Sequence, residues 1–211
     1  MDPASSLSVL LWSTATIGVV HALAPDHWVP FVSIGQAQQW SKTKLVGVTL
    51  LSGLGHVGVS ILLGGIGLML GFSLSGLEAV ESHRAEVAGL LLIVFGLVYA
   101  AWGLKQARAP HAPPNPKRTV TIWALVAIFV LGPCEPLIPL MFVSAAHGWP
   151  AVLAVSGLFA GITLAMMTGQ ALLGYLGVNL FKFVRINHHY SHVIAGLVIV
   201  STGLMVMALG I

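Results

Sequence analysis

The chain alternates long apolar stretches with short polar ones. Apolar residues dominate six stretches, at approximately 7–35, 45–71, 87–105, 119–144, 150–180 and 190–211. A transmembrane α-helix needs about 20 predominantly apolar residues to cross the bilayer, and each stretch is close to that length or longer. The pattern therefore predicts an all-α, polytopic membrane protein with six transmembrane helices.

The composition supports this prediction. Hydrophobic residues make up 57% of the 211-residue chain and charged residues only 7%, with a mean hydropathy of +0.95. Soluble domains carry about 25% charged residues, so a soluble fold of this composition would have too little polar surface. Residues 1–20 contain no Lys or Arg. They lack the basic region of a signal peptide, and we interpret them as half of a mature transmembrane helix.

One segment differs from the rest and divides the chain. Residues 107–118 contain four prolines with basic residues at both edges, which is typical of an extended connector outside the lipid. We predict a single integral membrane domain over 1–211. It has a first three-helix half at 1–106, a Pro-rich cytoplasmic linker at 107–118 and a second three-helix half at 119–211.

The basic residues predict the orientation. Eight of the nine Lys and Arg residues fall in loops on one side of the predicted membrane: Lys42, Lys44, Lys105, Arg108, Lys117, Arg118, Lys182 and Arg185. Only Arg84 falls on the other side. Because Lys and Arg accumulate in cytoplasmic loops, we expect a plasma or inner membrane protein with both termini outside. The basic residues are also scattered singly, which argues against nucleic acid as a partner.

The two halves carry similar short motifs. Asp26 and Pro30 in the first stretch have the same spacing as Glu135 and Pro139 in the fourth. Ser-Gly-Leu at 52–54 recurs at 156–158. A half with three spans ends on the side opposite to where it began, so a duplicated half lies upside down relative to the first. The sequence therefore predicts two inverted three-helix repeats.

Prolines accompany the acidic residues of the first and fourth stretches. Pro25 precedes Asp26, and Pro133 and Pro136 flank Glu135. Proline interrupts the hydrogen bonds of a helix, and such breaks at membrane depth persist where they are buried in protein or line a cavity. We predict broken helices 1 and 4. The acidic residues either form part of an ion site or cap the half-helices.

The first break carries donors suited to a metal ion. His21, Asp26 and His27 supply nitrogen and oxygen ligands that suit Ni²⁺, Co²⁺, Zn²⁺ or Cu²⁺. In an unbroken helix, residues 26 and 27 would point about 140° and 240° away from residue 21. The three side chains can converge only if Pro25 bends the chain.

Other candidate residues leave alternatives open. His56 lies on a polar stripe with Ser52 and Ser60, and is either a ligand or an interhelical hydrogen-bonding group. Cys134 is either a small buried hydrophobe or a soft ligand or gate. Three histidines at the start of the last stretch are either interfacial residues or a transient ion site: His188, His189 and His192.

These motifs resemble those of a known family. The pattern His21-x4-Asp26-His27 resembles the signature of the nickel/cobalt transporter superfamily, and Leu54-Gly55-His56 is similar to its second histidine motif. The segment 131–135 matches an acidic family motif loosely. The short urease-accessory membrane proteins, which are grouped near sulfite exporter-like proteins, look most similar. The resemblance implies transport of Ni²⁺ or Co²⁺ through a site built on the first motif.

The sequence therefore predicts a transporter, not an enzyme. Its cargo is a divalent transition-metal cation, Ni²⁺ or Co²⁺ first, with no permanently bound cofactor. His21, Asp26, His27 and His56 form the metal site, and Glu135 with Cys134 completes it or couples protons. Binding to imidazole releases protons, so we expect proton-linked transport. A sulfite or small-anion exporter and a membrane-embedded redox metalloprotein are the alternatives, and a homo-oligomer or a metal-delivery protein is left open as a partner.

Overall fold

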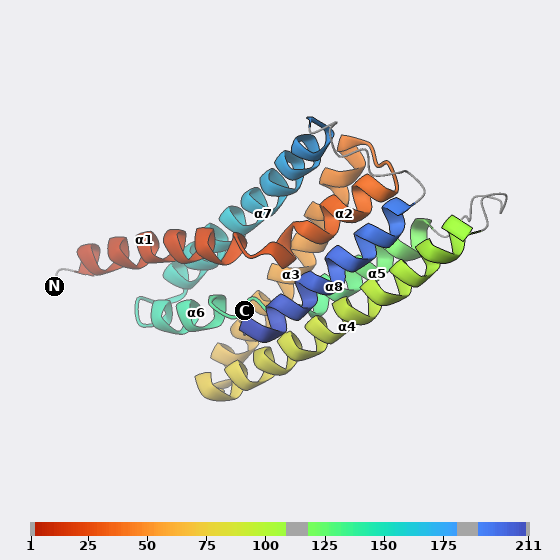
Figure 1. Cartoon of the computed structure of the whole chain (residues 1–211). Coiled ribbons are helices and arrows are strands. Elements are labelled where there is room, and N and C mark those ends of the chain that lie inside the picture. Colours follow the sequence, from red (N-terminus) through yellow and green to blue (C-terminus); the bar gives the residue numbers. More distant parts are fainter. Residues whose placement is uncertain (1–2, 109–117, 181–189, 210–211) are drawn as a thin grey trace.

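The computed structural model describes residues 3–108, 118–180 and 190–209, and within these ranges it is helical throughout, without strands. The elements follow one another along the chain in this order (Figure 1): α1 (Pro3–Ala22), the short 3₁₀ turn η1 (Pro25–His27), α2 (Val29–Ala37), α3 (Lys42–Leu70), α4 (Leu74–Arg108), α5 (Arg118–Leu131), α6 (Leu137–Ala145), α7 (Trp149–Leu180) and α8 (Ser191–Leu209). The predicted all-α class is confirmed. Most of the predicted linker, 109–117, and both His188 and His189 lie outside the described residues.

Four helices are long and apolar enough to cross a membrane: α3, α4, α7 and α8. The pair formed by α1 and α2 is a further candidate, bent by 74° at its break. Large apolar side chains such as Leu62, Val98 and Leu153 are more than half exposed on the outer faces of these helices. Lipid is the solvent that suits such surfaces, so the fold is that of a multi-pass membrane protein.

Helix α3 has clear start and stop signals in the sequence. The side chain of Ser41 accepts a hydrogen bond from the backbone N–H of Lys44 at 3.2 Å and caps the first turn. At the other end, Gly71 adopts a left-handed conformation with φ of 71°, which glycine tolerates best. The turn at Gly71 lets α4 begin only three residues later, at Leu74.

The start of α4 differs from the sequence prediction. The third apolar stretch was expected to begin near residue 87, with the charged residues before it in a loop. Instead α4 already includes Glu78, Glu81 and Arg84, and Glu81 is only 2% exposed. The many charged residues made this segment resemble a loop. It is nevertheless helical, and Glu81 and Arg84 pair with each other inside the protein. Arg84 therefore lies on a long helix and not in a loop, as its position before the apolar stretch had suggested.

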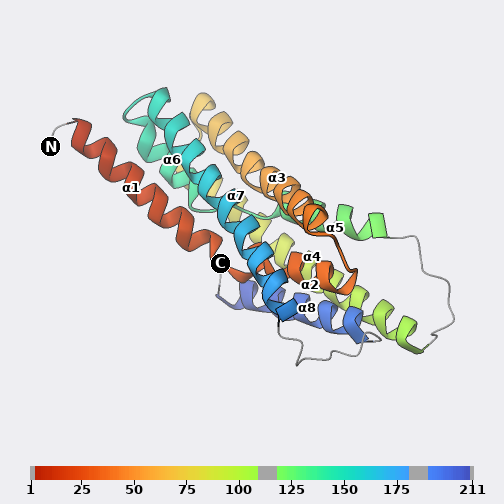
Figure 2. The ribbon, with the colours of Figure 1, turned by 90° about the horizontal axis from the view of Figure 1, so that it is seen from above.

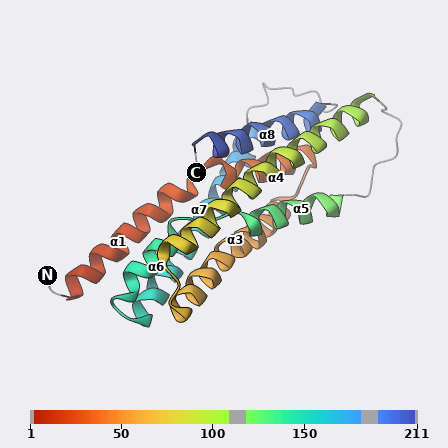
Figure 3. The same ribbon diagram turned by 90° about the horizontal axis from the view of Figure 1, so that it is seen from below.

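The helices pack as antiparallel and crossing pairs (Figures 2 and 3). Helix α4 lies along α8, α1 lies against α7, and α3 packs against both α5 and α7. Helices α4 and α8 approach each other closely, since a Cβ added at Gly196 would lie 2.5 Å from the backbone nitrogen of Ala100. Small residues allow helix backbones to come this close in membranes.

Candidate metal site

The first helix break brings two imidazoles together. Helix α1 ends at Ala22, and Pro25 opens the 3₁₀ turn η1 before α2 begins at Val29. Because the chain bends here, His21 on the last turn of α1 faces His27 at the end of η1. Their Nε2 atoms are 3.1 Å apart, which is a hydrogen bond in which one ring donates to the other. The bend that was required for these two side chains to converge is present.

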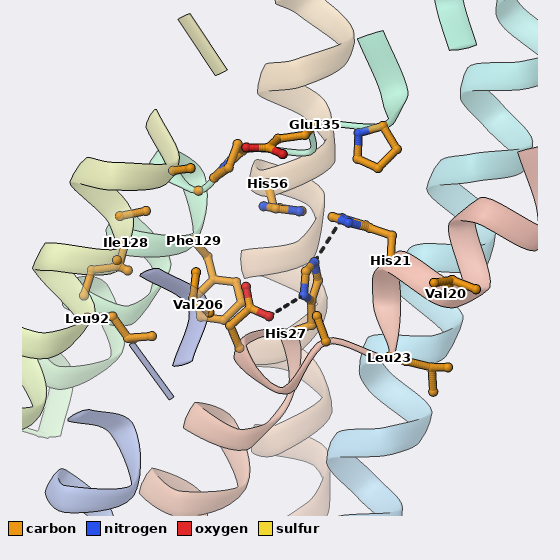
Figure 4. A pocket seen from close by; sticks show the side chains of 18 of the residues that line it. Val20, His21, Leu23, His27, His56, Leu92, Ile128, Phe129, Glu135 and Val206 are labelled. Carbon is orange, nitrogen blue, oxygen red and sulfur yellow. Dashed lines mark hydrogen bonds and ion pairs between the residues drawn. The ribbon is translucent and has the colours of Figure 1, made fainter. Parts of the chain in front are cut away.

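Asp26 reaches this pair through His27. Its Oδ1 atom lies 3.0 Å from Nδ1 of His27, on the side of the ring opposite to His21 (Figure 4). A carboxylate in this position orients the imidazole and increases its strength as a ligand. Asp26 therefore supports the cluster from outside, and its carboxylate is not part of the closest group of donors.

His56 of α3 completes a group of three histidines. Its ring centroid is 5.9 Å from that of His21 and 5.1 Å from that of His27. It is only 3% exposed, and neither ring nitrogen makes a hydrogen bond of normal geometry among the described residues, although the backbone carbonyl of Phe129 lies near the ring. Leaving a buried polar group unsatisfied costs about 1–3 kcal/mol, so His56 is a residue whose position calls for a ligand.

The second helix break places a thiol beside the histidines. Helix α5 ends at Leu131 and α6 begins at Leu137, with Pro133 and Pro136 in the interval. Cys134 lies in this interval and is fully buried, and its Sγ atom is 3.5 Å from Nε2 of His21. One ligand atom from each of His21, His56 and Cys134 lies within 4.8 Å of the other two. The cluster thus combines residues from α1, α3 and the α5–α6 break.

A cavity of about 610 Å³ adjoins the cluster. His21, Asp26, His27 and His56 line one part of it, and apolar residues of α1, α4, α5 and α8 line the rest (Figure 4). Glu135 also lines this cavity, but it makes no hydrogen bond with the three histidines among the described contacts. Glu135 is therefore near the cluster without joining it.

Sequence reasoning missed an ion pair next to the cluster. Glu81 and Arg84, one turn apart on α4, form an ion pair and are 2% and 13% exposed. The Arg84 guanidinium donates to the carbonyl oxygens of Val130 at 3.1 Å and Gly132 at 2.9 Å. A Glu81 carboxylate oxygen accepts from the backbone N–H of Cys134 at 3.0 Å. The pair therefore satisfies backbone groups that the second break leaves exposed.

The only available sequence signal for this pair was its spacing. Opposite charges three residues apart lie on the same face of a helix and form ion pairs there. Ser60 of α3, which the sequence placed on the polar stripe with His56, joins the same network by donating to Glu81 at 3.3 Å.

His192 lies elsewhere in the fold. Its Nδ1 atom is 2.8 Å from the hydroxyl of Tyr99, and its ring packs against Trp102. These contacts join α8 to α4, so the structure gives His192 a packing role at the helix interface.

No family model, curated protein or solved structure matches this chain.

Proposed function

We propose that the chain is a membrane transporter for a divalent transition-metal cation, with Ni²⁺ and Co²⁺ as the first choices. The observation that carries this proposal is the convergence of His21, His27, His56 and Cys134 between two helix breaks. Ionisable and unsatisfied groups inside a membrane protein mark ion pathways in general. Imidazole nitrogen is a ligand that these metals prefer.

The helix contacts support the finer arrangement of six spans in two inverted repeats. In such an arrangement, α1 and α2 correspond to α5 and α6, α3 corresponds to α7, and α4 corresponds to α8. Contacts between α1 and α7 then have their counterpart in those between α5 and α3, and contacts of α2 with α8 in those of α6 with α4. Both breaks would lie at the interface of the repeats, where transporters of this type bind their cargo.

Arg84 is the feature that bears on the alternative of an anion exporter. Such an exporter requires a cation within the spans, and Arg84 is one. However, the charge of Arg84 is paired with Glu81, its other donors are used by the backbone of the second break, and it does not line the cavity. A paired guanidinium outside the cavity is poorly placed to bind an anion.

The proposal is tested by measuring flux in proteoliposomes. We expect ⁶³Ni²⁺ or ⁵⁷Co²⁺ to cross membranes that contain the wild-type protein, and to cross at least 10-fold more slowly with His21→Ala or His56→Ala. The exposed His83, which pairs only with Glu86 on the surface of α4, provides the control variant His83→Ala. Sulfite flux without metal flux would establish the anion exporter instead. Bound redox-active metal without any flux would favour the redox protein.

A further inference from the structure

The only thiol of the chain lies beside the histidine cluster. Cys134 is the only cysteine of the chain, it is fully buried, and it faces His21 from the opposite half of the molecule. A buried thiol is usually an inert apolar group. Here it is one of three donors within 4.8 Å of one another, in company with two imidazoles.

His56 gives an independent reason to place a ligand here. It is 3% exposed, and among the described residues its ring nitrogens have only the nearby backbone carbonyl of Phe129, which makes no hydrogen bond of normal geometry with them. A histidine needed only for packing would be expected to donate at least one hydrogen bond, as His192 shares one with Tyr99. One ring nitrogen of His56 lies within 4.8 Å of ligand atoms of both His21 and Cys134 and can bind an ion between them.

The position of Cys134 is held from behind. The backbone N–H of Cys134 donates to a carboxylate oxygen of Glu81 and to the hydroxyl oxygen of Ser60. Arg84 donates to the carbonyl oxygen of Gly132, two residues before Cys134. A tetrahedral site with nitrogen and sulfur ligands places them roughly 3.3–3.8 Å apart. The cluster must therefore close by about 1 Å around an ion, a movement within the range of side-chain rotations.

We propose that His21, His56 and Cys134 are the metal ligands, two imidazoles and one thiolate, with water as the fourth ligand of a tetrahedral ion. His27, oriented by Asp26, holds His21 through its Nε2 atom until the ion replaces that hydrogen bond. The cargo is then a transition-metal ion that accepts thiolate, such as Co²⁺, Ni²⁺ or Zn²⁺, and not a hard ion such as Mg²⁺ or Mn²⁺. When the ion binds, the Sγ–H bond breaks as the Sγ–metal bond forms, and the proton leaves to water. Calling the ion cargo depends on the proposed transport function, but the ligand set does not.

Cobalt spectroscopy tests the ligand set without measuring transport. The protein is purified in detergent without a polyhistidine tag and titrated with Co²⁺. We expect one equivalent to bind with tetrahedral visible bands and an intense thiolate-to-cobalt charge-transfer band in the near ultraviolet. Because the chain has a single cysteine, this band can arise only from Cys134.

Two variants and a competition sharpen the test. Cys134→Ser keeps the size of the side chain and is expected to lose the charge-transfer band and at least 10-fold in affinity, whereas His83→Ala on the exposed surface of α4 keeps both. Zn²⁺ should displace Co²⁺ and quench the band, while a 100-fold excess of Mg²⁺ should leave it unchanged. Bound Co²⁺ without the band, or no Co²⁺ binding by a monodisperse wild-type protein, would overturn the ligand set. Metal flux without the band would leave the transporter proposal standing alone.

Discussion

At the scale of single residues, the four histidine and aspartate side chains of the cluster differ in how their bonding capacity is used. Asp26 is hydrogen-bonded to His27 at 3.0 Å, and His27 is hydrogen-bonded to His21 at 3.1 Å. His56 makes no hydrogen bond of normal geometry among the described residues. These residues therefore respond differently to substitution, and the difference can be measured.

Removing the carboxylate of Asp26 is expected to weaken metal binding without abolishing it. Asp26→Ala deprives His27 of its partner at Nδ1, so the imidazole pair loses its fixed orientation. Because His27 is not itself in the proposed ligand set, we expect a smaller loss of metal affinity than the about 10- to 100-fold typical of a carboxylate bonded directly to a ligand histidine. Asp26→Asn keeps a hydrogen-bond acceptor and should fall between the wild type and Asp26→Ala in a Co²⁺ titration. Equal affinity in all three proteins would show that Asp26 has no supporting role.

Replacing His56 with an apolar residue should have opposite effects on binding and stability. His56→Leu removes a ligand and should reduce metal affinity at least 10-fold. It also removes two buried ring nitrogens that make no hydrogen bond of normal geometry, so we expect the metal-free protein to be as stable as the wild type or more stable by about 1 kcal/mol. Thermal unfolding in detergent, with metal excluded by a chelator, measures this difference. Clear destabilisation would mean that His56 has a structural partner when the protein is in a membrane.

At the scale of elements, the second helix break depends on α4. The interval between α5 and α6 leaves buried backbone groups without helical hydrogen bonds. Glu81 and Arg84 bond to several of these groups. A charged pair is therefore used to stabilise an irregular segment at membrane depth. Unsatisfied backbone groups there would each cost several kcal/mol.

Substitutions of Glu81 and Arg84 should have coupled effects on stability. Glu81→Gln or Arg84→Met alone leaves one buried charge without its partner, which typically costs about 3–5 kcal/mol. The double variant leaves no unpaired charge but also loses the bonds from Arg84 to the carbonyls of Val130 and Gly132, so it should lose less stability than the sum of the two single variants. Unfolding of the four proteins by denaturant provides the comparison. Additive losses in the double variant would show that the two residues act independently.

The sequence predicted the elements that apolar length and proline control. The apolar stretches, the break at Pro25 and the interruption around Pro133 all follow from local chemistry. The Glu81–Arg84 pair was missed because a charged run resembles a loop until its burial is known. The position of Cys134 beside His21 was not predictable either, since the two residues are 113 positions apart and meet only through the packing of helices.

At the scale of the whole molecule, basic residues gather at one end. The start of α3 carries Lys42 and Lys44, and the last turn of α4 carries Lys105 and Arg108. In Figure 3, these two helix ends lie far from the turn that joins α3 to α4 and from the start of α1. The asymmetry supports an orientation in which the basic end faces the cytoplasm.

Cysteine labelling tests this orientation. In a Cys134→Ser background, Ser75→Cys and Lys42→Cys place single exposed thiols near opposite ends of α3. A membrane-impermeant maleimide should modify Ser75→Cys in intact cells, and Lys42→Cys only after the cells are made permeable. The reverse pattern would place the basic end outside and invert the proposed topology.

Because its single thiol is fully buried, the wild-type protein can report conformational opening through the rate at which Cys134 is modified. Cys134 is covered completely in this conformation, and no second cysteine contributes a background signal. A small thiosulfonate reagent can therefore reach it only when the protein opens toward one side of the membrane. Its modification rate, measured with reagent applied to one side and then the other, reports how often each side opens during turnover.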